Sequence, residues 1–188
     1  MKVLIVSDSH GLTEELIELK KRYRTEVQAM IHCGDSELDA QGEAMTEYIA
    51  VQGNCDFDLN FVVDQLVSIK SEGISDGLAF YVTHGHLYNV KMTLMNLRYR
   101  AEEVGANVVC FGHSHIAGAE LIDNILFINP GSIRLPRLRK EKTFAILEVD
   151  DAKNCVVRFF SIDGKEIDEL TLFSKLNKLT PPADASDF

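Results

Sequence analysis

The chain has 188 residues and a formal net charge of −10 at pH 7, with 19 lysines and arginines against 29 aspartates and glutamates. Hydrophobic residues make up 46% and charged residues 26%, a balance typical of a globular domain that excludes a disordered chain or a coiled coil. The acidic balance also excludes a protein that mainly coats nucleic acid or an anionic membrane. A small anionic substrate stays compatible with it, provided that a local positive site reverses the field.

The N-terminal run and the cysteines predict the compartment. The apolar run is only four residues long and meets Asp8 almost at once, so it predicts a buried strand and no signal peptide. No segment approaches the roughly 20 apolar residues of a membrane span. The cysteines form no C-x-x-C pair and are expected to be reduced thiols, at Cys33, Cys55, Cys110 and Cys155. We therefore expect a cytoplasmic protein that does not engage a membrane.

Strands and helices alternate over the first two thirds of the chain. Short apolar runs predict buried strands, and apolar side chains that recur on one face at helical spacing predict helices. In chain order we expect a strand at residues 2–7, a helix at 12–23, strands at 29–33 and 48–52, a strand pair at 66–70 and 79–83, a helix at 90–104 and a strand at 107–111.

The last third of the chain changes to strands alone. Apolar patterns predict strands at residues 120–129, 143–149 and 155–160, with a turn at 150–154, and a final strand at 164–172. The two prolines and the polar residues of the C-terminal segment predict a flexible tail at 180–188. Because no repeat or linker interrupts the chain, we expect residues 1–179 to form a single α/β domain.

Side chains able to bind metal or move protons directly follow five of the predicted strands. At these positions side chains project into a crevice beyond the carboxyl ends of the strands. The clusters are Asp8-Ser9-His10, Gly34-Asp35, Gly53-Asn54-Cys55-Asp56, His84-Gly85-His86 and Gly112-His113-Ser114-His115.

The spacing within the clusters predicts a metal site. Residues two apart in an extended segment point to the same side, so Asp8 and His10 can face one centre. Mixed oxygen and nitrogen ligands suit Mn, Fe, Ni, Co or Zn ions. Taken singly, a histidine after a strand is more often a hydrogen-bonded turn residue, a Gly-Asp pair is commonly just a turn, and Asn54 is equally well explained as one. Together they favour two ions that share a carboxylate, because one ion takes only about four to six ligands. The candidates are Asp8, His10, Asp35, Asn54, His84, His113 and His115.

The order of the clusters resembles the calcineurin-like metallophosphoesterases. The signature of that family is D-x-H, G-D, G-N-x-[DE], H and G-H-x-H, and the chain matches every motif in this order between residues 8 and 115. The small size, Cys55 and the run Asn129-Pro130-Gly131-Ser132 most resemble its small bacterial and archaeal phosphodiesterases. The resemblance implies an α/β fold, a four-layer αββα sandwich in which helices flank two mixed β-sheets.

The resemblance also implies a division of the ligands. Two divalent ions per chain are expected, with Mn²⁺ first and Ni²⁺, Co²⁺, Fe²⁺, Zn²⁺ or Mg²⁺ as alternatives. A hydroxide that bridges the ions would attack phosphorus in line. In this division Asp35 bridges, the first ion is held by Asp8, His10 and His115, and the second by Asn54, His84 and His113.

Cys55 departs from the best-known members, which carry a histidine after the metal-binding asparagine to stabilise the transition state or protonate the leaving oxygen. A thiol of pKa about 8.5 is protonated at neutral pH but donates only weak hydrogen bonds. Asp56 and His86 are the candidates to compensate, so the expected catalytic set is Asp35, Asn54, Cys55, Asp56 and His86. We expect phosphodiesters with good leaving groups to be hydrolysed faster than alkyl esters.

Two features outside the signature also bear on the site. His32 precedes Gly34 by two residues and is expected to orient the turn there. Five of the 19 basic residues fall in the segment 134–142. Arginine forks match phosphate oxygens, which makes Arg134 and Arg137 candidate substrate contacts, although a solvated hairpin explains the segment as well.

The complete ligand set favours an enzyme over a binding module. The expected substrate is a small phosphate ester, and the chain is expected to act as a monomer or homodimer. The alternative is a metal-binding but catalytically silent protein-interaction module of the same fold, like the retromer subunit that resembles this family. Such relatives have lost ligands, whereas this chain keeps all seven positions.

Overall fold

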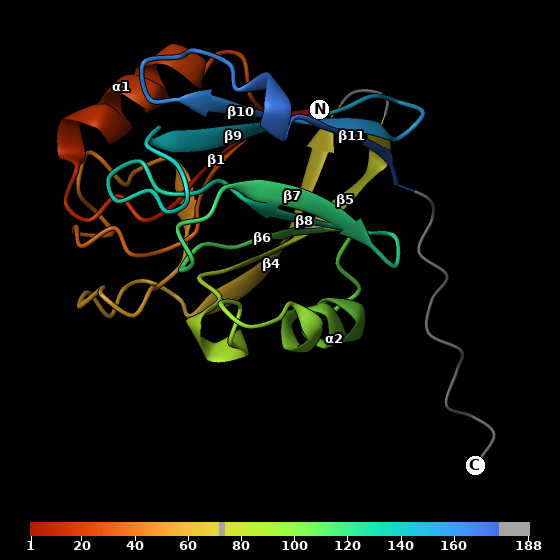
Figure 1. Cartoon of the computed structure of the whole chain (residues 1–188), viewed down its shortest axis with the longest axis horizontal. Helices are drawn as coiled ribbons and strands as arrows, with labels where there is room; N and C mark the ends of the chain where they lie inside the picture. Colours follow the sequence, from red (N-terminus) through yellow and green to blue (C-terminus); the bar gives the residue numbers. More distant parts are fainter. Residues whose placement is uncertain (72–73, 177–188) are drawn as a thin grey trace.

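The computed structural model describes residues 1–71 and 74–176. Figure 1 shows the arrangement of its elements. In chain order these are β1 (Lys2–Val6), α1 (Thr13–Tyr23), β2 (Ala29–His32), β3 (Tyr48–Ala50), β4 (Asp64–Ser71), β5 (Ile74–Thr83), the 3-10 helix η1 (His86–Tyr88), α2 (Met95–Glu103), β6 (Val108–Cys110), β7 (Gly118–Ile122), β8 (Ile125–Asn129), β9 (Thr143–Val149), β10 (Asn154–Ser161), the 3-10 helix η2 (Asp168–Leu170) and β11 (Leu172–Lys175).

The strands form two mixed sheets. The first has the order β11-β10-β9-β1-β2-β3, in which β1, β2 and β3 are parallel and the β9, β10 and β11 pairings are antiparallel. The second has the order β4-β5-β6-β8-β7, in which β5, β6 and β8 are parallel and the two edge strands pair antiparallel. The parallel strands therefore occupy the interior of the second sheet and one side of the first.

Alternate residues of β1 show how the layers are packed. Val3 and Ile5 belong to the core between the sheets, whereas Leu4 and Val6 pack on the outer face with Leu16 of α1. All four of these apolar side chains are fully buried. A strand buried on both faces reads as a continuous apolar run, which is why the sequence shows no alternation there. Fully burying each such side chain contributes about 1.5–3 kcal/mol.

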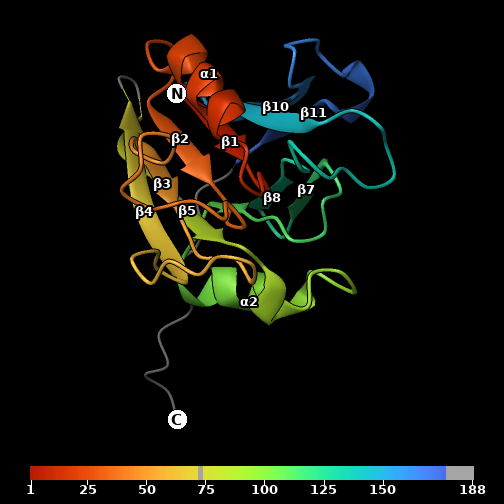
Figure 2. The ribbon, with the colours of Figure 1, turned by 90° about the vertical axis from the view of Figure 1, so that its left-hand side faces the viewer.

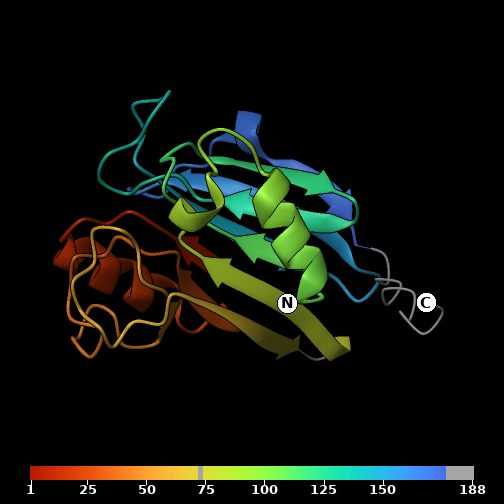
Figure 3. The same cartoon turned by 90° about the horizontal axis from the view of Figure 1, so that it is seen from below.

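The second sheet repeats this arrangement. Phe80 and Val82 of β5 enter the core between the sheets, and Tyr81 packs on the other face with Leu97 and Ala101 of α2. Figures 2 and 3 show α1 and α2 on the two opposite outer faces. The four-layer αββα sandwich with two mixed sheets is thus confirmed.

Three expected elements differ from the structure. The helix expected at 90–104 begins only at Met95, because residues near Asn89 make turns and the Thr93 hydroxyl accepts the hydrogen bond of the Met95 amide. The single strand expected at 120–129 is the hairpin β7–β8, with Asp123 and Asn124 both at positive φ in its turn. The final strand expected at 164–172 is wrong, since η2 occupies 168–170 and β11 begins at Leu172. The tail expected at 180–188, like the domain end at 179, lies outside the described residues.

The topology places the five clusters at one edge of the sandwich. The clusters follow β1, β2 and β3 in the first sheet and β5 and β6 in the second. Parallel strands end at the same edge of a sheet, so side chains that follow them share one crevice. Backbone hydrogen bonds join the neighbouring loops. The Asp8 amide donates to the Gly34 carbonyl at 3.0 Å, and the Gly112 amide donates to the His84 carbonyl at 3.1 Å.

Candidate metal centre

The backbone at this edge is unusual for side-chain-bearing residues. Five of the seven predicted ligands have positive φ values, between 44° and 65°. Non-glycine residues adopt this region in only a few per cent of cases, and they cluster at functional sites where the surrounding structure holds them. The residues are Asp8, His10, Asp35, His113 and His115.

Four of the predicted ligands form a tight donor cluster. Metal-ligating atoms of Asp8, His10, Asp35 and His115 all lie within 4.8 Å of one another. His115 Nε2 lies 3.1 Å from Asp8 Oδ1 and 3.5 Å from His10 Nε2. Asp8 Oδ1 is buried and accepts no hydrogen bond. A buried carboxylate oxygen without a donor is costly, and a divalent cation would satisfy it, so these donors fit a metal ion.

A second group of donors surrounds His84. Its Nε2 lies 3.2 Å from Asn54 Oδ1 and 3.3 Å from Asp35 Oδ2. Its Nδ1 lies 2.8 Å from the Cys33 carbonyl oxygen, which can only accept, so Nδ1 carries the proton and donates. In neutral His84 the lone pair is therefore on Nε2, directed at the group. Such a hydrogen bond to a backbone carbonyl is how metal-binding histidines are commonly oriented.

Backbone and carboxylate groups orient two more histidines in the same manner. His115 Nδ1 donates to the Leu135 carbonyl at 2.7 Å. His10 Nδ1 lies 2.7 Å from Glu37 Oε1. In each case the Nε2 atom is left for the donor cluster. Sequence reasoning missed Glu37, since nothing in its local pattern distinguishes it from other exposed acidic residues.

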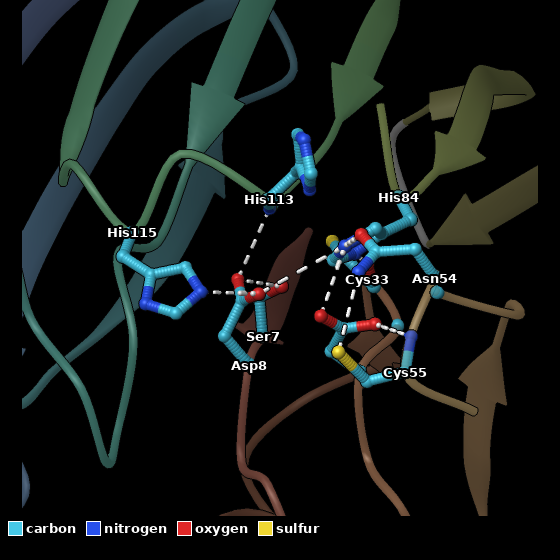
Figure 4. A network of polar contacts seen from close by, with 12 residues as sticks. Ser7, Asp8, Cys33, Asn54, Cys55, His84, His113 and His115 are labelled. Carbon is cyan, nitrogen blue, oxygen red and sulfur yellow. Dashed lines mark hydrogen bonds and ion pairs between the residues drawn. The ribbon is translucent and has the colours of Figure 1, made fainter. Parts of the chain in front are cut away.

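His113 lies across the cluster from Cys55 (Figure 4). Its ring centroid is 5.1 Å from that of His84, and its backbone amide donates to Asp8 Oδ2 at 3.2 Å. Burial, together with the charge of His84, lowers the pKa of His113 to about 4. His113 is therefore neutral at pH 7, which is the form that binds metal.

Asp35 occupies the junction of the two groups. Its Oδ1 accepts a hydrogen bond from the Cys55 amide at 2.8 Å, and its Oδ2 faces His84. Burial acts to raise the pKa of Asp35, but the hydrogen bond and charge of His84 and the Cys55 amide together hold it well below its usual range. The carboxylate is thus ionised and in contact with both donor groups.

The Asp56 carboxylate accepts hydrogen bonds from the loops that carry the ligands. Its Oδ2 accepts from the amides of Asp35 and Gly53, both at 2.8 Å, and its Oδ1 accepts from Ser36 Oγ at 2.9 Å and the Glu37 amide at 2.6 Å. Both oxygens are occupied by donors of the two metal-binding loops. This arrangement favours a positioning role for Asp56 over the proton-donating role expected from the sequence.

The other two candidate catalytic residues lie at the periphery of the cluster. Burial and the neighbouring Asp35 raise the pKa of the Cys55 thiol to about 11, and the thiol accepts a hydrogen bond from Asn54 Nδ2 at 3.2 Å. The His86 ring is 5.4 Å from that of His84 and 6.0 Å from that of His113. His86 Nδ1 is buried without a hydrogen-bond partner. Burial, followed by the charge of His84, lowers the pKa of His86.

The two candidate arginines lie on the loop after β8. The Arg134 guanidinium donates to the His10 carbonyl, and the Arg137 amide donates to the His115 carbonyl at 3.0 Å. Both residues are exposed. These two hydrogen bonds tie the loop to both histidines of the first donor group.

Further residues orient the ligand loops. Ser7 Oγ donates to Asp8 Oδ2 at 2.6 Å, and Ser132 Oγ donates to the Asp8 carbonyl at 2.7 Å. The Gly34 amide donates to His32 Nδ1 at 3.2 Å, so His32 orients the turn as expected. Ser132 belongs to the run Asn129-Pro130-Gly131-Ser132, which the sequence singles out by its resemblance to the small phosphodiesterases of the family. The only sequence signal for Ser7 is its place directly before Asp8.

Gly112 leaves no room for a side chain beside the first donor group. A Cβ there would overlap Ser7 Oγ and approach Asp8 Oδ2 to 2.7 Å. We expect Gly112→Ala to displace Asp8, to lower the free energy of unfolding by about 1–3 kcal/mol and to weaken metal binding. Gly118→Ala is the matched control, because its Cβ meets nothing within 4 Å. Urea denaturation and metal titration of both variants test this, and equal metal affinity in the two would contradict it.

The two-sheet sandwich, with aspartates and histidines gathered at the carboxyl ends of its strands, places the protein among the metallophosphoesterases. The solved structure of a predicted phosphoesterase from Streptococcus pneumoniae matches it with a TM-score of 0.86 and 31% identity, covering 93% of this chain and 97% of that one. Vps29 of Entamoeba histolytica, solved with Zn²⁺, shares the fold with a TM-score of 0.68 and 17% identity, over 94% of this chain and all of that one.

Sequence comparison makes the assignment specific. The calcineurin-like phosphoesterase superfamily domain matches residues 1–152, and the chain belongs to that superfamily. "Probable metallophosphoesterase YsnB" of Bacillus subtilis is 52% identical over 170 residues, 90% of this chain and 96% of the relative. "Phosphodiesterase MJ0936" of Methanocaldococcus jannaschii is 30% identical over 145 residues, 70% and 83% of the two chains. The resemblance seen in the order of the motifs is confirmed.

Within residues 1–71 and 74–176, no helix has the length and apolar character needed to cross a membrane.

Proposed function

We propose that the protein is a phosphodiesterase that uses two divalent metal ions, with Mn²⁺ as the first expectation, to hydrolyse a small phosphate ester. The observation that carries this proposal is the convergence of oxygen and nitrogen donors from three loops, those after β1, β2 and β6, around one buried carboxylate oxygen of Asp8. Names of relatives that include phosphodiesterases support the same class of substrate. The four cysteines are free, which agrees with a reducing compartment such as the cytoplasm.

The ligands divide between the two donor groups described above. Asp35 touches both groups and is the residue suited to bridge them, because its two oxygens face different neighbours. The first ion would be held by Asp8, His10 and His115, and the second by Asn54, His84 and His113. When bound, two such ions supply a hydroxide nucleophile at neutral pH and offset the charge on the phosphoryl oxygens.

The chain's own residues hold this arrangement in place. Carbonyls of Cys33 and Leu135 fix which ring nitrogen of His84 and His115 is protonated, and Glu37 does the same for His10. Second-sphere hydrogen bonds of this kind typically change metal affinity or activity by about 10–100-fold. Arg134 and Arg137, on the adjoining loop, are positioned to contribute positive charge where an anionic ester approaches.

Cys55 limits which leaving groups the site handles well. With a pKa of about 11, its thiol is protonated at neutral pH but remains a weak hydrogen-bond donor. Aryl leaving groups need little proton donation, whereas alkyl oxygens need a competent acid. We expect Cys55→His to raise kcat for alkyl phosphodiesters by about 10–100-fold and to change aryl ester turnover much less, since general acid catalysis contributes about 10²–10⁴-fold.

Steady-state kinetics of Cys55→His and of a control variant, each on matched aryl and alkyl diesters, measures this effect. Cys155→Ser is the control for thiol loss, because Cys155 is buried in the core on β10, a strand that no predicted ligand follows. Equal effects of Cys55→His on both ester types would contradict the assigned role.

The proposed activity is tested by hydrolysis of bis(p-nitrophenyl) phosphate. Metal-stripped protein is expected to be inactive, and activity is expected to return when Mn²⁺ or another divalent ion is added back. A protein that binds two ions per chain but hydrolyses nothing with any of them would instead support the alternative, a metal-binding but catalytically silent interaction module of the same fold.

A further inference from the structure

A cavity of about 610 Å³ adjoins the metal cluster on the outer face of the second sheet. Ser114, which lies between the ligands His113 and His115, lines it, as does Arg137, whose amide is bonded to the His115 carbonyl. The cavity is thus continuous with the loop that carries two ligands. Its volume falls within the about 300–1,000 Å³ of small-molecule pockets. The apolar part of its wall includes Val90, Leu94, Phe111, Ile116 and Phe127.

Glycine opens the floor of this cavity. Gly118 pairs with Asn129 in the β7–β8 ladder, and a Cβ at this position would meet nothing within 4 Å. Gly118 lines the cavity together with Ala117 and Ala119, whose side chains also pack against the core between the sheets, and strand residues alternate between faces. Gly118 therefore faces the cavity. Gly118 is the first residue of β7, and a glycine in a strand often marks a place where a ligand approaches the backbone closely.

The charges around the cavity favour an anionic ligand. Lys91, from the turn before α2, and Arg137, from the loop after β8, both line it, against one acidic residue, Glu120. This is a local excess of positive charge on a protein whose formal net charge is −10.

We infer that this cavity binds the ester group that stays on phosphorus, and that the group it takes is apolar and the size of an aromatic ring. The inference rests on the proposed phosphodiesterase function. Figure 4 shows His115 and Cys55 on opposite sides of Asp8. The leaving oxygen is assigned to the side of Cys55, and the cavity adjoins the side of His115. Lys91 and Arg137 then attract the anionic diester as its apolar group enters between them.

Two substrates with one leaving group test this assignment. Bis(p-nitrophenyl) phosphate and methyl p-nitrophenyl phosphate both release p-nitrophenolate, but they retain an aryl and a methyl group. We expect the wild-type protein to have the lower KM for the aryl diester. Gly118→Leu places an isobutyl group on the floor of the cavity and should raise that KM by about tenfold or more, because a single methylene changes specificity in an apolar pocket by about 10–200-fold. The KM for the methyl diester should change by less than about twofold.

Graded and control variants complete the experiment. Gly118→Ala should give an intermediate KM, and Leu121→Phe, which adds bulk to the opposite face of β7, should leave both substrates unchanged. Should Gly118→Leu fail to fold, Ile116→Ser removes an exposed part of the apolar wall and should raise the KM of the aryl diester selectively. If the wild-type protein hydrolyses both diesters and the variants change both KM values equally, the cavity does not bind the retained ester group and the inference is wrong. A wild-type protein inactive on both would overturn the proposed function itself.

Discussion

Replacing Asp35 by Asn is expected to remove the second metal ion and to lower kcat for bis(p-nitrophenyl) phosphate by more than about 100-fold. Losing a second-sphere partner alone typically costs 10–100-fold, and Asp35 is assigned directly to both ions. The amide keeps the shape of the side chain and can still accept the Cys55 amide hydrogen bond. It cannot carry the negative charge that offsets the repulsion between two cations.

Metal content per chain and turnover should be measured on the same sample. Asp39→Asn is the control, since Asp39 is exposed and its side chain accepts a hydrogen bond from the Gln41 amide. An Asp35→Asn protein that retains two ions and full activity would refute the bridging assignment.

Replacing Asp56 by Ala is expected to produce the largest loss of stability among single changes at the site, at least about 3 kcal/mol. The substitution leaves the amides of Asp35, Glu37 and Gly53 and the Ser36 hydroxyl without their acceptor. Each buried donor left unsatisfied costs about 1–3 kcal/mol. Because these donors belong to the loops that carry the ligands, metal affinity should fall as well.

Urea denaturation of the metal-free protein measures this loss separately from metal binding. Asp58→Ala is the matched control in the same loop, because the Asp58 carboxylate accepts from the Ala40 and Asn60 amides nearer the surface. We expect the control to cost about 1 kcal/mol or less. If Asp56→Ala kept its stability and metal affinity but lost turnover, Asp56 would be a proton donor and the positioning role would be wrong.

The sequence predicts the site residues best where a side chain able to bind metal directly follows a strand. Ligand positions such as Asp8 and His84 could be predicted because each directly follows an apolar run, and parallel strands deliver such positions to a single edge. Both flanking helices were also predicted, although α2 is shorter than expected. There, local hydrogen bonds of Asn89 and Thr93 override the apolar periodicity of residues 90–94.

What the sequence could not predict depends on contacts between distant loops. Glu37 contacts His10 only because the loops after β1 and β2 meet, and Asp56 serves two loops through backbone amides that carry no sequence signal. Gly118 showed no special feature in the chain. The role proposed for Gly118 depends on the hairpin β7–β8, which places this residue on the floor of a cavity.

A titration of metal-stripped protein with Mn²⁺, following bound metal and hydrolysis of bis(p-nitrophenyl) phosphate together, tests the dinuclear site most directly. We predict little turnover at one bound equivalent and a steep rise as the second binds, because Asp35 and the two donor groups are assigned to act as one unit. Full activity at a single equivalent, or two bound equivalents with no activity under any divalent ion, would contradict the account.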